Sequence, residues 1–130
     1  MKYRTSTEGA IQRALFTHLR MRAAAGVVAF HVPNGGYRRP IEAAIMKGQG
    51  VLSGVPDVIA VKNGCTYALE LKPPGGRLTQ AQSAAHAALR DAGAVVATTF
   101  CLDDAITVLE HWGLLRGRAS VISNRVREQR

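Results

Sequence analysis

Apolar residues along this chain follow two spacings, one typical of helices and one typical of strands. In residues 7–25, Ile11, Leu15 and Leu19 recur at helical spacing opposite polar positions, which predicts an amphipathic helix. Residues 27–32 are rich in β-branched side chains and predict a strand. The same patterns predict a short helix at 41–47, strands at 55–61, 66–72 and 94–100, and helices at 79–92 and 103–115. This order of helices and strands is typical of one α/β domain.

A tight turn joins the two central predicted strands. Asn63 and Gly64 stand between two apolar runs, and both residue types tolerate the positive φ that a two-residue hairpin loop requires. With these two residues as the loop, Lys62 pairs with Cys65, and the register of the whole hairpin follows. The turn therefore predicts which side chains share one face of the sheet.

Two carboxylates and an ammonium group converge on one face in this register. Asp57 faces Glu70 across the antiparallel pair, and Lys72 emerges on the same side. Opposed carboxylates repel, and a hard divalent cation such as Mg2+ would offset that repulsion while keeping water ligands for exchange. Lys72 would add a positive charge suited to a phosphate oxygen or to the attacking water.

The alternative is a solvated hairpin face on which each carboxylate pairs with a lysine or an arginine. Leu69 and Leu71 flank Glu70, and Val58 follows Asp57, so both acids stand in apolar strands. Ionised groups are rare in such surroundings unless they have an interaction partner or a functional role. The apolar neighbours therefore favour the metal site.

The chain is strongly basic, with 130 residues and a formal net charge of +8. This charge favours a polyanionic partner, because counterion release gives basic proteins affinity for nucleic acid. An anionic membrane surface is the competing partner, but no apolar stretch approaches the roughly 20 residues that a span needs. No secretory signal is visible, and two cysteines are too few for a disulfide framework. We therefore expect a cytoplasmic protein, in a bacterium or a phage-infected cell, with no membrane association.

Basic residues gather in two segments outside the predicted helices and strands. Residues 1–115 form the predicted folded domain, and residues 116–130 are rich in arginine with little apolar content. The second range predicts a mobile basic tail that could act as a non-specific nucleic-acid arm. Arg38 and Arg39, next to Tyr37, could bind a nucleic-acid backbone. The alternative is that they belong to an exposed charged loop with no binding role.

Two polar residues near helix starts have a structural as well as a chemical explanation. Thr5 and Glu8 fit a capping box, in which the Glu8 carboxylate binds the backbone N–H of Thr5. Thr79 and Gln82 fit a second capping box. The pattern alone favours a cap over a metal ligand for Glu8, and capping also accounts for Gln82.

Three motifs, in order along the chain, resemble a known family of nucleases. They are GVPD at Gly54–Asp57, LELK at Leu69–Lys72 and LTQAQ at Leu78–Gln82. With a glutamate in the first helix, they resemble the VRR-NUC nucleases of the PD-(D/E)xK superfamily. The loop that contains Asn34 and two glycines is similar to that of short, stand-alone phage-type members.

The resemblance implies a restriction-endonuclease-like core, in which helices flank a mixed central β-sheet. It also implies a divalent ion, Mg2+ or Mn2+, held by Asp57, Glu70 and the backbone carbonyl of Leu71. Glu8 would be a further acidic ligand, so the resemblance raises it from a cap to a ligand.

The resemblance also assigns roles to residues that do not hold the ion. It implies that Lys72 positions or activates the water and that Gln82 braces the site from its helix, with Gln80 as the competing residue for that brace. We expect four residues to contact the nucleic acid, namely Asn34, Arg38, Arg39 and Arg77.

These inferences together predict a divalent-metal-dependent DNA endonuclease that hydrolyses phosphodiester bonds by in-line attack of water. The resemblance implies a homodimer that acts on branched DNA, with four-way (Holliday) junctions among its substrates and no small-molecule substrate. Two alternatives stay open. One is a non-catalytic, basic nucleic-acid-binding module, and the other is a sequence-specific restriction-type endonuclease.

Overall fold

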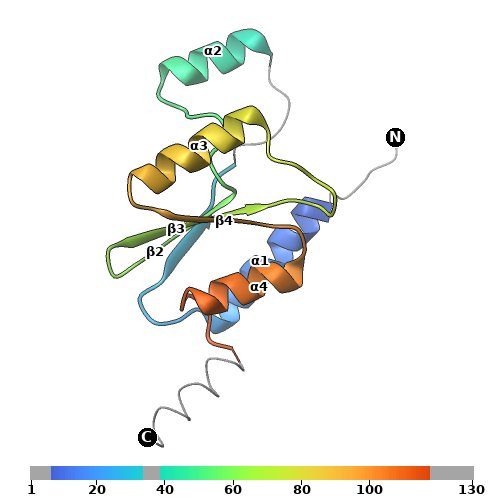
Figure 1. The fold of residues 1–130 in the computed structure, drawn as a ribbon, viewed down its shortest axis with the longest axis vertical. Helices are drawn as coiled ribbons and strands as arrows, with labels where there is room; N and C mark the ends of the chain where they lie inside the picture. The colour runs from blue at the N-terminus through green and yellow to red at the C-terminus, as the bar shows by residue number, and fades with distance from the viewer. Residues whose placement is uncertain (1–6, 34–38, 118–130) are drawn as a thin grey trace, which may run out of the picture.

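The computed structural model describes residues 7–33 and 39–117, in which helices and strands follow one another in the predicted order (Figure 1). Most of the predicted basic tail, residues 118–130, lies outside the described residues. The elements are α1 (Thr7–Arg22), β1 (Val28–His31), α2 (Pro40–Gly48), β2 (Val58–Lys62), β3 (Cys65–Leu71), α3 (Gln80–Asp91), β4 (Val95–Thr99) and α4 (Leu102–His111).

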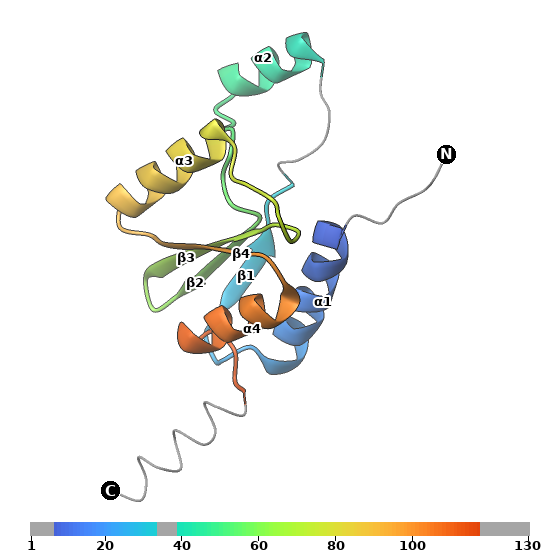
Figure 2. The same cartoon turned by 45° about the vertical axis from the view of Figure 1, so that its right-hand side comes forward.

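A four-stranded mixed sheet forms the centre of the domain, with its strands in the order β1-β2-β3-β4. The pairs β1–β2 and β2–β3 are antiparallel, and β3–β4 is parallel. Figures 1 and 2 show α1 and α4 together on one face of the sheet and α3 on the other. The predicted α/β fold with helices flanking a mixed sheet is therefore confirmed.

The hydrophobic core lies between the sheet and the layer formed by α1 and α4. Leu15 and Leu19 of α1 belong to it, together with Leu69 and Leu71 of β3. Because side chains alternate along a strand, the inward direction of these two β3 leucines turns Glu70 to the opposite face, beneath α3. The apolar pattern of β3 thereby carries one carboxylate to the helix-covered side of the sheet.

The hairpin has the predicted register, with Asn63 at φ 52° and Gly64 at φ 78° in the turn and Lys62 paired with Cys65. One detail of the prediction is wrong. The β2–β3 ladder ends at the pair Val58–Leu69, so Asp57 precedes β2 instead of lying within a strand at 55–61.

The side chain of Asp57 explains why the β2–β3 ladder stops before it. Its Oδ2 accepts a hydrogen bond from the N–H of Leu71 at 2.9 Å, while on the β1 side its backbone carbonyl accepts one from the N–H of Val32 at 2.8 Å. The carboxylate thus takes the N–H that a continuing hairpin would have paired with backbone.

The first and last helices both end earlier than their apolar patterns predict. α1 ends at Arg22, and the N–H of Ala24 donates to the carbonyl of Leu114 at 2.9 Å instead of continuing the helix. α4 ends at His111, and Gly113, at φ 78°, turns the chain. Leu114 and Leu115 remain buried after the turn, which is why the apolar pattern continues beyond the helix.

Helix α2 stands apart from this core. Figure 1 shows it beyond α3, and none of its residues is buried. Ile41 and Ile45 are exposed on it. Across the described ranges, no helix has the length and apolar character that crossing a membrane requires.

Gly54 brings the segment that precedes Asp57 against the start of α3. Its φ is +86°, and a Cβ at this position would lie 2.4 Å from the backbone oxygen of Ala81 and 2.7 Å from the backbone nitrogen of Gln82. A side chain does not fit there. The contact therefore sets the distance between the first turn of α3 and the segment that carries Asp57.

We expect Gly54→Ala to destabilise the domain by about 3 kcal/mol, because it adds a backbone clash to the strain of a positive φ. Gly26→Ala is the matched control, since Gly26 has a φ of +83° with nothing within 4 Å of a Cβ. The control should lose only about 1 kcal/mol. Urea unfolding of the two variants measures both losses, and equal losses would show that the approach to α3 is not tight.

Candidate metal centre

Three carboxylates from distant parts of the sequence meet at one end of the sheet. Glu8 comes from α1, Asp57 from the segment before β2, and Glu70 from β3. One carboxylate oxygen from each lies within 4.8 Å of the others. The structure thus brings together the three acidic residues that the sequence singled out, and their role as metal ligands remains a prediction.

Asp57 is held at both its backbone and its side chain. Besides the bond from Leu71, its backbone oxygen lies 2.9 Å from Nδ1 of His31. A carbonyl oxygen only accepts hydrogen bonds, so Nδ1 of His31 carries the proton in this contact. The sequence did not single out His31.

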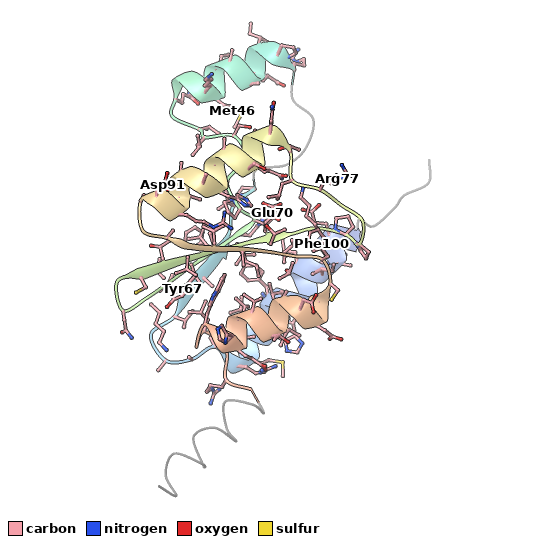
Figure 3. The ribbon with its side chains drawn as sticks, in the orientation of Figure 1. Met46, Tyr67, Glu70, Arg77, Asp91 and Phe100 are labelled. Carbon is pink, nitrogen blue, oxygen red and sulfur yellow. The ribbon has the colours of Figure 1, made fainter. Side chains whose placement is uncertain are left out.

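Glu70 is the most deeply buried of the three acids, with 1% of its surface exposed. Figure 3 shows it between the sheet and α3. Its Oε2 accepts a hydrogen bond from Nε2 of Gln82 at 3.3 Å, and its Oε1 lies 3.4 Å from Nε2 of His86. A buried carboxylate is costly unless it is well paired, and these two contacts are long.

Gln82 both caps α3 and contacts Glu70. The hydroxyl of Thr79 accepts a hydrogen bond from the backbone N–H of Gln82 at 3.1 Å, and Oε1 of Gln82 accepts one from the N–H of Thr79 at 2.9 Å. The predicted capping box is therefore confirmed. Because the cap uses the amide oxygen and Glu70 uses the amide nitrogen, one side chain serves the helix and the site together.

Burial and repulsion from Asp57 disturb the protonation of Glu70 and Glu8. Burial, followed by the charge of Asp57 and hydrogen bonding with it, raises the pKa of Glu70 to about 8. Burial and the same Asp57 charge also raise the pKa of Glu8. A divalent cation among the three groups would favour their ionised forms, and carboxylate oxygens are the donors that Mg2+ and Mn2+ prefer. The donor set therefore fits such an ion.

Lys72 contributes a positive charge next to the acids. Its ammonium lowers the pKa of both Glu8 and Glu70, which opposes the effect of burial. Its backbone N–H donates to the carbonyl of Thr99 at 2.9 Å, which fixes the chain at the end of β3. The proposed roles of Lys72 and of the Leu71 carbonyl stay predictions.

Of the four residues expected to contact nucleic acid, the structure describes Arg39 and Arg77. Asn34 and Arg38 lie outside the described residues, as does Thr5 of the predicted first capping box. Arg39 pairs with Glu42 at 3.1 Å at the start of α2, and both side chains are largely exposed. Arg77 is exposed in the loop before α3, and Figure 3 shows it near the end of the sheet where Glu70 lies.

His86 also belongs to the site, although no pattern in the sequence pointed to it. The signal that could have identified it is its spacing from Gln82 along the helix. Residues four apart lie on the same face of a helix, so a brace at Gln82 places His86 next to it. His86 is fully buried, and burial lowers its pKa.

Comparisons with known proteins agree with this geometry at the level of fold. No protein-family model matches the chain, and no curated protein matches it significantly. A solved structure described as a "VRR_NUC domain protein" superposes with a TM-score of 0.67 and 19% identity, covering 88% of this chain and 100% of that one. The chain has the fold of a VRR-NUC domain.

A second solved structure, described as a "VRR_NUC domain", supports the same conclusion. It superposes with a TM-score of 0.58 at 19% identity and covers 83% of this chain and 99% of that one. This VRR-NUC fold agrees with the family that the three sequence motifs resemble. At such identity the likeness concerns the fold, and the chemistry has to be argued from the side chains.

The pKa of Glu70 predicts how the stability of the ion-free protein depends on pH. Its ordinary value of 4.5 applies to the unfolded chain, and its folded value is about 8. The stability that this group contributes is full below pH 4.5 and is lost as the pH rises towards 8. The lowered pKa of His86 acts in the opposite sense, but only below its ordinary value of 6.5.

We therefore expect the free energy of unfolding, measured with urea in the presence of EDTA, to fall between pH 6.5 and 8. Glu70→Gln should flatten this fall, because the amide does not titrate. Parallel slopes for the variant and the wild type would contradict the assigned pKa of Glu70.

Proposed function

We propose that this protein is a divalent-metal-dependent DNA endonuclease. The observation that carries the proposal is the meeting of Glu8, Asp57 and Glu70 within 4.8 Å, with Lys72 beside them, in a VRR-NUC fold. Three carboxylates in a confined site repel one another, and their association is explained by a cation that they bind. A phosphodiester is the substrate class that fits such an ion and the net charge of +8.

The three carboxylates would hold Mg2+ or Mn2+, and the carbonyl of Leu71 is the proposed fourth protein ligand. When bound, the ion lowers the pKa of a coordinated water and neutralises charge on the phosphate. The protein holds these oxygen donors in position through hydrogen bonds. Asp57 is anchored to the N–H of Leu71, and Gln82 orients Glu70 from α3.

Lys72 acts beside the ion site and not within it. Its ammonium is a compact, movable charge on a half-buried stem, suited to a non-bridging phosphate oxygen or to the attacking water. It would thereby align the phosphate for in-line attack and stabilise the charge that develops there.

The surface around the site is proposed to hold branched DNA. Arg77 would contact the backbone close to the cleaved bond, and we propose Asn34, Arg38, Arg39 and the arginine-rich residues 116–130 as further contacts to DNA. Two cuts in a symmetric four-way junction require two sites related by a two-fold axis, so we propose that the enzyme acts as a homodimer. Both of these proposals rest on the resemblance of the motifs to stand-alone VRR-NUC nucleases.

Asp57→Asn should abolish cleavage of an end-labelled four-way junction in Mg2+ or Mn2+, lowering the rate at least about 100-fold. Junction binding, measured by fluorescence anisotropy in EDTA, should be unchanged or tighter, because a negative charge near the phosphates is lost.

Asp91→Asn is the matched control for Asp57→Asn, since it makes the same chemical change at an exposed position. Figure 3 shows Asp91 at the end of α3 opposite Arg77. Full activity in Asp57→Asn would refute the assignment of the metal site. Tight binding by the wild type without cleavage of junction, splayed arm, duplex or single strand would instead favour the non-catalytic binding module.

Homodimerisation predicts a mass of two chains by light scattering at micromolar concentration, with paired, symmetric cuts across the junction. A single-chain mass both with and without junction DNA would contradict the dimer and leave the metal site untouched. Cleavage of one duplex sequence in preference to all branched substrates would favour the restriction-type alternative.

A further inference from the structure

Two buried side chains face each other behind the metal centre. Nε2 of His86 lies 3.4 Å from Oε1 of Glu70, and each side chain has 1% of its surface exposed. Neither atom has a hydrogen-bond partner among the described residues. An imidazole N–H and a carboxylate oxygen are complementary groups, so this is a loose contact between a donor and an acceptor.

Helix α3 approaches the carboxylate of Glu70 at both oxygens. Gln82 donates to Oε2 at 3.3 Å, and His86, one helical turn later, lies against Oε1. The capping box at Thr79 and the close contact at Gly54 fix the start of this helix. A rigid element therefore presents two donors to the two oxygens of one carboxylate.

Packing alone does not account for a histidine at position 86. Its Nδ1 also lacks a partner among the described residues, and an unsatisfied buried polar group costs about 1–3 kcal/mol. The neighbouring buried position on α3 is Ala85, and an apolar residue would fill the site of His86 without that cost. The cost is explained if Nε2 serves Glu70.

We propose that His86 is a positioning residue, which holds Oε1 of Glu70 through Nε2–H and so fixes the orientation in which this carboxylate meets a divalent cation. The inference rests on the proposed function, because it assumes that Glu70 is a ligand. Partners that orient a metal ligand typically change metal affinity by about 10–100-fold when they are removed.

A neutral imidazole suits this role, because with its proton on Nε2 it donates to Glu70 without adding a positive charge that would compete with the cation.

Mn2+ binding by isothermal titration calorimetry, with no DNA present, tests this inference. His86→Leu keeps a similar apolar volume and removes the donor, so the affinity should fall roughly 10-fold. His86→Gln places an amide N–H near the position of Nε2, and its affinity should stay within about threefold of the wild type. His86→Asn is too short to reach, so it should resemble His86→Leu.

A merely structural histidine would give a different pattern, in which Mn2+ affinity follows fold stability across the variants and not the reach of the donor. The matched control is His111→Leu, which makes the same change at an exposed residue at the end of α4. It should bind Mn2+ as the wild type does. Wild-type affinity in both His86→Leu and His86→Asn would overturn the inference.

Asp57→Asn in the same titration separates the two proposals. If it loses Mn2+ binding while His86→Leu and His86→Asn both retain it, the metal site stands and the role of His86 is wrong. If the wild type itself binds no Mn2+, the proposed function fails and the inference fails with it. If His86→Leu does not fold, the contrast between His86→Gln and His86→Asn still decides.

Discussion

The burial of a carboxylate at the centre of a sheet is the constraint on which the rest of this structure depends. Glu70 lies on an inner strand between two core leucines and is 1% exposed. An ionised group in that position is destabilising by several kcal/mol unless it is compensated. The nearest groups include Asp57 and Glu8, which add to the negative charge, and Lys72 is the cation whose charge opposes them. Such an unfavourable arrangement of charges is typical of functional sites.

Much of the fold could be predicted from the sequence because its signals are local. Asn63 and Gly64 set the hairpin register through their own φ values, and Thr79 and Gln82 form a cap within one turn. Alternation in β3 then carries Glu70 to the face beneath α3. Convergence of Asp57 and Glu70 followed from these local rules, although Asp57 reaches the site from just outside the strand.

The remaining features depend on contacts between segments distant in sequence, which periodicity does not report. Glu8 fits a cap as well as a ligand until α1 is placed beside the sheet. In the sequence, Gly54 resembles any turn glycine, because its close approach to α3 is visible only in the structure. The role of His86 likewise cannot be predicted without the position of Glu70. The early end of α4 could not be predicted for the same reason. Leu114 is buried after the turn that follows α4, so the apolar pattern continues past the end of the helix.

A crystal structure of the protein with Mn2+ would decide whether Glu8, Asp57 and Glu70 hold a divalent cation. Anomalous scattering locates manganese independently of any model of the side chains. If the three carboxylates bind the ion, an anomalous peak will lie among them, with at least one oxygen of each within coordination distance. A crystal in which manganese binds elsewhere, or in which Glu70 stays paired only with α3 at saturating Mn2+, would contradict the proposed metal site.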